Sequence, residues 1–163
     1  MVVGSTGAGT AKMEMGMLSH SEPGPEDLWF LPLGGCGEIG MNLNLFGHNR
    51  QWLMVDCGVH FTRPSKFNAH PIIEMPDTSF VDNLNGALVA LLVTHAHEDH
   101  IGAIATLWHR WGCPLVATPF AAEVIRRRAL SRGAAIPEPI IIASPGNEKR
   151  FGSFIVRWIS MNH

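Results

Sequence analysis

The sequence has few cysteines, no long apolar run and almost no net charge. Its three cysteines, Cys36, Cys57 and Cys113, are too few and too widely spaced for a disulfide framework or a CxxC metal clip. We expect them to be small buried side chains in a reducing cytoplasm. No apolar stretch approaches the roughly 20 residues that a membrane span requires. These absences exclude a disulfide-stapled secreted protein and predict a cytoplasmic protein without a membrane partner.

Charge of either sign is also scarce, with 12 Lys and Arg against 14 Asp and Glu and a formal net charge of −2. A protein that is basic all over is thereby excluded, and any contact with nucleic acid needs a local patch. The N-terminus has neither the basic start nor the apolar centre of a secretory signal. Its Gly, Ser, Met and Pro content predicts a disordered tail over residues 1–27.

The rest of the chain, residues 28–163, alternates strand and helix patterns and predicts an α/β layered domain. Apolar runs or period-2 alternation predict strands at 28–33, 41–46, 51–58 and 87–94, and the second and third of these are expected to form a hairpin. Helical spacing predicts helices over 76–85, 101–111 and 119–133. Short strands are expected at 114–118 and over the C-terminal part.

The stretch "THAHEDHIGA" carries the chemistry, because it places three histidines and an aspartate directly after an apolar run. Side chains two residues apart on an extended chain point the same way, so His95 and His97 can converge on one ion. Asp99 and His100 come from the following turn and suit a second, adjacent ion. Zinc accepts imidazole and carboxylate ligands, and two ions assist displacement at phosphorus. The predicted reaction is metal-assisted hydrolysis.

Interpretations without a metal also stay open for these residues. The cluster could be a surface loop that is rich in histidine by chance. Glu98, between the candidate ligands, is expected to face solvent or to support them, with a direct ligand role as the lesser alternative.

The same stretch resembles the signature of the metallo-β-lactamase fold. "PLGGCGEIGMN" followed by "VDCG" resembles the opening of ribonuclease J, in the β-CASP branch of that superfamily. The resemblance implies an αββα sandwich, of which this chain supplies the first half and the start of the second. It also implies a cytoplasmic, zinc-dependent nuclease with two ions, which cuts single-stranded RNA internally and trims it 5′→3′. A homo-oligomer is implied for the full-length parent.

The resemblance also assigns roles to residues. His95, His97 and His163 correspond to ligands of the first zinc, and Asp99 and His100 to those of the second. Asp56, in "VDCG", corresponds to an aspartate that braces the ligand loop, so that the implied catalytic residues are Asp56, Asp99 and His100. Outer carboxylates of this kind orient metal ligands. Asp56 could instead simply end a strand at a turn, and His163 could be a frayed last residue.

Three further features have both a structural and a functional interpretation. The glycines from Gly34 to Gly40 favour tight turns beside the metal cleft, fixed by hydrogen bonds of Glu38 and Asn42, over direct contact with substrate. The arginines at 126–128 and 132 favour a solvated helix face over contact with RNA. The five tryptophans favour the core over base stacking.

Several features of the resembled family have no counterpart in this sequence. The bridging aspartate, the distal histidine and the inserted β-CASP domain have no candidates, so a truncated N-terminal fragment, inert by itself, is the leading hypothesis. A first sheet with one uncovered apolar face is expected. Two other hypotheses stay open: a hydrolase of small thioester or lactam substrates, and a non-enzymatic zinc-binding module that pairs with another chain.

Overall fold

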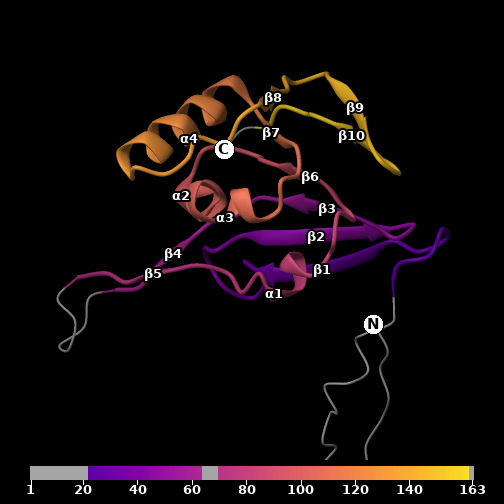
Figure 1. Ribbon diagram of the computed structural model, residues 1–163, viewed down its shortest axis with the longest axis horizontal. Coiled ribbons are helices and arrows are strands. Elements are labelled where there is room, and N and C mark those ends of the chain that lie inside the picture. The colour runs from indigo at the N-terminus through magenta and orange to yellow at the C-terminus, as the bar shows by residue number, and fades with distance from the viewer. Residues whose placement is uncertain (1–21, 64–69, 162–163) are drawn as a thin grey trace, which may run out of the picture.

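A six-stranded mixed sheet organises the chain, for which the computed structural model describes residues 22–63 and 70–161 (Figure 1). The strand order is β1-β2-β3-β6-β7-β8. Strands β1, β2 and β3 pair antiparallel with one another, whereas β3, β6, β7 and β8 pair in parallel. The predicted α/β class and the predicted hairpin, now β2 and β3, are confirmed. The strands of this sheet are β1 Trp29–Gly34, β2 Leu43–His48, β3 Gln51–Val55, β6 Leu88–Leu92, β7 Leu115–Ala117 and β8 Ile140–Ile142.

Two further pairs of strands lie outside this sheet. The first is β4 (His60–Phe61) with β5 (Ile73–Glu74). The second is the hairpin of β9 (Glu148–Phe151) and β10 (Phe154–Arg157).

Of the helices, α4 (Pro119–Ser131) is the longest and follows its sequence signals closely. Thr118 caps it, since its hydroxyl accepts a hydrogen bond from the Ala121 amide at 3.3 Å, and Pro119 occupies the first turn. The short helix α1 (Ser79–Asp82) lies within the predicted segment 76–85. No membrane-spanning helix is found in the described part of the chain, since none combines the necessary length and apolar character.

The single helix predicted over 101–111 is wrong, because the chain forms α2 (Glu98–Ile101), α3 (Ile104–Leu107) and a 3-10 turn, η1 (Trp108–Arg110). The break after α2 has a hydrogen-bonding cause. The Asp99 carbonyl accepts from the Asn42 amide at 2.9 Å, and the Ala103 amide donates instead to the Cys57 carbonyl at 3.1 Å. An uninterrupted helix would pair these two groups with each other.

The two faces of the sheet carry separate apolar clusters. On one face, strand residues such as Met54 and Leu91 pack with Ile101 of α2, Ile104 of α3 and Ile125 of α4. On the other face, a smaller cluster contains Leu53, Ala90, Leu92, Val116 and Ala143. The alternation of Ala90, Leu91 and Leu92 between the clusters follows the period of a strand buried on both sides. All five tryptophans lie in or against these clusters, as the core interpretation predicts.

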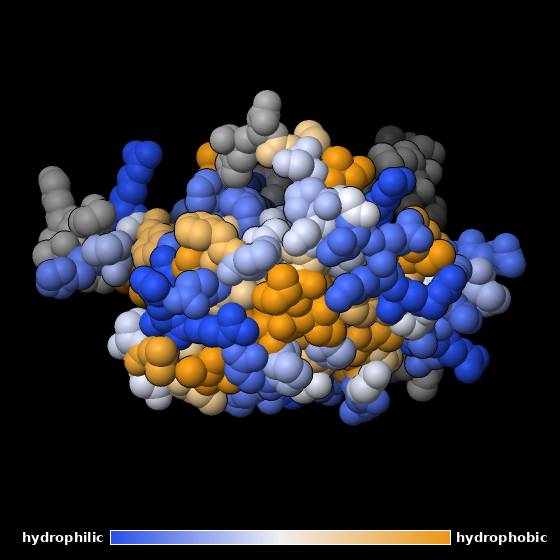
Figure 2. All heavy atoms as spheres, turned by 90° about the horizontal axis from the view of Figure 1, so that it is seen from above, coloured by the Kyte–Doolittle hydropathy of each residue, from blue (hydrophilic) through white to orange (hydrophobic). Residues whose placement is uncertain are grey.

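The second face is partly covered, which corrects the expectation of an uncovered apolar sheet. Phe151 of β9 and Phe154, Val156 and Trp158 of the β10 region pack against its cluster. Apolar side chains also remain exposed beyond them, among them Ile155, Ile159 and Met161. Figure 2, which looks onto α4 and the hairpin from above, shows orange patches separated by polar side chains.

The segment before β1 makes ordered contacts where it is described. Residues 1–21 of the expected tail lie outside the described residues. Pro23 is buried, and its carbonyl accepts from the Arg50 amide at 2.6 Å, while the Gly24 carbonyl accepts from the Asn49 amide at 2.9 Å. Residues 22–27 therefore lie against the turn between β2 and β3.

The close approach of α2 to the loop after β3 predicts that Gly58→Ala is destabilising. A Cβ at position 58 would lie 1.7 Å from the Asp99 carbonyl oxygen, so either α2 or the loop must move. We expect a loss of about 3 kcal/mol, at the upper end for overpacking, measured by urea unfolding followed by tryptophan fluorescence. The control is Gly37→Ala, which has open space but a φ of +81° and should cost about 1 kcal/mol. Equal losses for the two variants would contradict the packing argument.

Candidate metal centre

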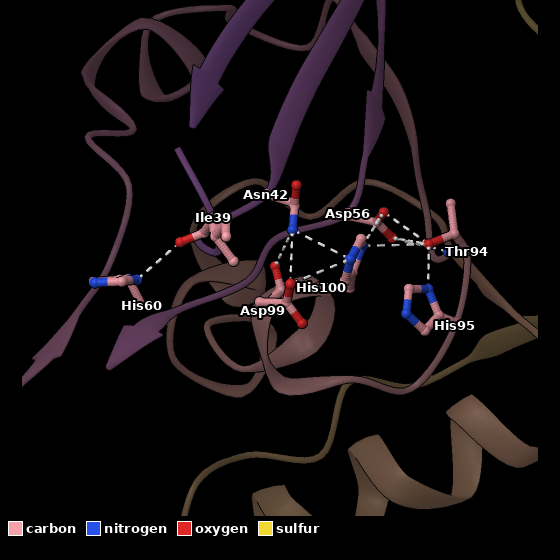
Figure 3. Close-up of polar contacts among 8 residues, drawn as sticks. All are labelled: Ile39, Asn42, Asp56, His60, Thr94, His95, Asp99 and His100. Carbon is pink, nitrogen blue, oxygen red and sulfur yellow. Dashed lines mark hydrogen bonds and ion pairs between the residues drawn. The ribbon is translucent and has the colours of Figure 1, made fainter. Parts of the chain in front are cut away.

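The predicted site residues gather at one edge of the sheet, where β3 and β6 end. These strands are parallel neighbours, with Val55 opposite Leu92. Asp56 follows β3 directly, and the segment from Thr94 to His100 follows β6 and leads into α2 (Figure 3). The topology therefore brings together two motifs that are separated by about forty residues of sequence.

Asp56 is a buried carboxylate with several hydrogen bonds. Its side chain is 4% exposed, and its backbone has the left-handed φ of 63° that aspartate tolerates better than most residues. Oδ1 accepts from the Thr94 amide at 2.8 Å, and Oδ2 accepts from the Thr94 hydroxyl at 2.8 Å and contacts His100 Nδ1 at 2.7 Å. The carboxylate thus joins the end of β3 to both ends of the histidine segment, as its predicted bracing role requires.

Three histidine rings converge beside Asp56. The ring centroids of His95 and His97 are 4.5 Å apart, and those of His95 and His100 are 4.1 Å apart. The convergence was predicted from strand periodicity, but β6 ends at Leu92, so a bend of the chain produces it. Asp99 and His100 belong to the first turn of α2, with His100 Nε2 3.5 Å from Asp99 Oδ2. His163 lies outside the described residues.

Asn42, at the end of the glycine-rich segment, contacts the same turn. Its side-chain nitrogen donates to the Asp99 carbonyl at 3.0 Å and to Asp99 Oδ2 at 3.1 Å, and lies 3.2 Å from His100 Nε2 (Figure 3). Gly35, with φ +78°, allows this arrangement, because a Cβ there would lie 2.2 Å from Asn42 Oδ1. The Glu38 side chain in turn accepts from the Gly35 amide at 3.3 Å. The predicted fixing of this loop by Glu38 and Asn42 is confirmed.

His100 is the titrating group whose environment matters most. Partial burial disfavours the charged ring, but the hydrogen bond to Asp56 and the charges of Asp56 and Asp99 outweigh it and raise the pKa of His100 above its usual range. In the neutral ring, a proton on Nδ1 donated to Asp56 leaves the Nε2 lone pair facing Asn42 and Asp99. Asp56 therefore selects the tautomer in which Nε2 can act as a ligand.

The donor set fits zinc, which binds imidazole nitrogen and carboxylate oxygen. The histidine rings and the Asp99 carboxylate supply these atoms between positions 95 and 100. Among residues 22–63 and 70–161, however, no group of three His, Cys, Asp or Glu side chains is arranged so that it could hold an ion. The contacts of His100 with Asp56 and Asn42 orient the ring through protein groups on both of its nitrogens.

Thr94 is a site residue that the sequence reasoning missed. Its hydroxyl donates to Asp56 and lies 3.0 Å from His95 Nδ1. Its place immediately before the first histidine was the available signal. Glu98 supports the site from the side instead of facing solvent freely, since it pairs with Arg128 of α4.

The arginines of α4 all have protein partners. The solvated-face interpretation suits Arg127, which is largely exposed and pairs with Glu123 four residues earlier. The other three reach across to Glu138, Glu98 and the Gly102 carbonyl, from Arg126, Arg128 and Arg132 in that order.

The cysteines differ in environment. Burial raises the pKa of the Cys57 thiol strongly and that of Cys113 to about 11, so both are inert small side chains as expected. Cys36 is exposed, which corrects the expectation that all three are buried.

Comparisons with known proteins agree with this geometry. A family model described as the metallo-beta-lactamase superfamily matches residues 41–158. Ribonuclease J of Sinorhizobium meliloti is 39% identical over 155 residues, covering 93% of this chain and 27% of that protein. Ribonuclease J of Corynebacterium glutamicum is 37% identical over 132 residues, covering 80% of this chain and 18% of that protein. The chain thus spans about a quarter or less of the length of these curated relatives.

Solved structures agree on the fold. MEM-A1, a subclass B3 metallo-beta-lactamase from a soil metagenome library, has a TM-score of 0.51 and 16% identity over 83% of this chain and 49% of its own. The Rm3 metallo-beta-lactamase has a TM-score of 0.50 and 17% identity over 77% of this chain and 46% of its own. The fold matched is mixed α/β, over about half of each lactamase. With its family model, its sheet and its relatives in agreement, the chain belongs to the metallo-beta-lactamase superfamily and is homologous over most of its length to ribonuclease J.

Proposed function

We propose that this chain supplies part of the metal-binding domain of a zinc-dependent ribonuclease that hydrolyses single-stranded RNA, internally and 5′→3′. One observation carries the proposal: the chain is 39% identical to a ribonuclease J over 155 residues, and its histidine segment is held together by a buried aspartate. Resemblance to lactamases below 25% identity supports the fold alone, so a thioester or lactam substrate has weaker support.

In this proposal His95, His97 and His163 hold a first zinc ion, and Asp99 and His100 hold a second. These residues would hold the zinc ions, which would supply Lewis-acid activation of water and of a phosphoryl oxygen. Asp56 Oδ2 lies 2.7 Å from His100 Nδ1 and keeps the proton of His100 on that nitrogen. Nε2 therefore stays available as a ligand. Asn42 holds the Asp99 carboxylate at 3.1 Å in the same turn.

Partners and location follow from the same proposal. The substrate is single-stranded RNA, and homo-oligomers are proposed for full-length proteins that contain this part of the fold. Three free cysteines suit a reducing compartment, so a cytoplasmic location is part of the proposal.

We expect the purified chain to retain zinc after exhaustive dialysis, and His97→Ala to lose most of it, because neutral imidazoles are strong zinc ligands. Elemental analysis per chain measures this. Zinc-dependent cleavage of a 5′-monophosphorylated single-stranded RNA, compared with a thioester and a lactam, tests the substrate.

The matched control is His109→Ala, since His109 is exposed on η1, away from the histidine segment. It should retain zinc as the wild type does. Zinc retention that does not depend on His97, or turnover of the thioester or lactam without any action on RNA, would contradict the proposal.

The raised pKa of His100 predicts a pH dependence in the metal-free chain. The protonated ring stabilises the fold fully below the pKa of an unfolded histidine, about 6.5, and this contribution is lost as the pH rises through the folded pKa. Zinc competes with that proton, so zinc affinity should rise over the same interval. NMR titration of the His100 ring measures the pKa directly.

Asp56→Asn should lower the pKa of His100, because it removes the accepting carboxylate and its charge. Asp77→Asn is the control, since Asp77 is exposed beside α1 and bonds to Ser79. A His100 pKa that is the same in wild type and Asp56→Asn would refute the assigned cause.

A further inference from the structure

Two arginines at the C-terminal end of α4, Arg128 and the capping residue Arg132, contact the two ends of α2. Arg128 forms an ion pair between Nη1 and Glu98 Oε1, and Glu98 is the first residue of α2. Arg132 Nη1 donates to the Gly102 carbonyl at 2.9 Å, and Gly102 is the residue that caps the end of α2. Residues four apart lie on one face of a helix, so the two arginines reach α2 from the same side of α4.

The Glu98 pair is more buried than the Arg127 pair on the same helix. The side chains of Arg128 and Glu98 are 33% and 26% exposed, against 78% and 52% for Arg127 and Glu123 on the same helix. Arg128 Nε and Glu98 Oε2 are buried and have no hydrogen-bond partner among the described residues. Burial of paired charges is weak evidence for stability, and its best-attested use is to fix one arrangement of packed elements.

The position of Glu98 identifies which arrangement is fixed. Glu98 lies between His97 and Asp99, and its carbonyl accepts from the Val59 amide at 3.1 Å and the Gly102 amide at 2.8 Å. Its backbone is therefore held by the loop after β3, while its side chain is held by α4. A rotation of α2 that moved Asp99 and His100 would have to break the Arg128 pair, the Arg132 hydrogen bond or both.

We propose that Glu98, Arg128 and Arg132 are positioning residues that set the orientation of Asp99 and His100 toward the metal. This inference rests on the proposed function, because it takes Asp99 and His100 as ligands. The three residues touch neither metal nor substrate. They act through α2, as outer partners of metal ligands act through the ligands themselves.

The test measures the zinc affinity of the full 163-residue chain by competition with a chromophoric chelator. Arg128→Gln and Glu98→Gln should each weaken zinc binding by about tenfold, the lower end for lost outer partners. The double variant should be no weaker than either single variant, since both remove the same pair. Arg132→Gln, which leaves the pair intact, is a second probe and should also weaken binding.

Arg127→Gln is the matched control, because it removes an exposed pair on the same helix and should leave zinc affinity unchanged. All affinities are measured well below the unfolding temperature of each variant. Equal zinc affinity in wild type, Arg128→Gln and Arg132→Gln, whatever their stabilities, would overturn the inference and leave a purely structural role.

Failure of the proposed function has a different signature. A chain that binds zinc in the expected order of variants but turns over the thioester or the lactam and not RNA contradicts the ribonuclease and supports the positioning role. If the wild type binds no zinc, amide hydrogen exchange in α2 is the deciding measurement. Exchange at Ile101 and Gly102 that is about tenfold faster in Arg128→Gln, but not in Arg127→Gln, supports the positioning of α2 by Arg128. Unchanged exchange in both overturns it.

Discussion

The Asp56 carboxylate is the contact on which the candidate site depends, because it joins the end of β3 to the segment after β6 and to α2. It is buried, and the Thr94 amide, the Thr94 hydroxyl and the His100 ring all converge on it. A buried carboxylate is costly unless it is fully hydrogen-bonded. These partners satisfy Asp56, and in doing so they fix the position and the tautomer of His100.

The sheet was predictable because its strands carry strong local signals. The apolar run around β6 indicates a strand buried on both faces, and the clusters on the two faces bear this out. Thr118, Pro119 and Gly133 mark the limits of α4. The helix expected over 101–111 failed for a reason that no local pattern contains. Asn42 and Cys57, which are distant in sequence, take the hydrogen bonds that would have continued α2.

The cluster of histidines and aspartate could also be found from the sequence, because its candidate ligands all lie within six positions. The supports of this cluster were less accessible to sequence reasoning. The only sign of Thr94 in the sequence was its position directly before His95. Arg128 and Arg132 gave none, because a run of arginines on a helix has the same sequence pattern whether it faces solvent or an ion-pair partner across a packed interface.

The turn that carries the candidate ligands Asp99 and His100 is held from three directions, which restricts its movement. Asp56 holds it from the sheet, Asn42 from the glycine-rich segment and Arg128 with Arg132 from α4. Three supports from separate elements restrict rotation of α2 more than any one of them could, since each resists a different displacement. Metal sites depend on such restriction, because ligands lose affinity when their partners let them reorient. Asn42, Asp56, Arg128 and Arg132 all lie within the residues that the family model matches, 41–158, so these supports belong to the lactamase fold itself.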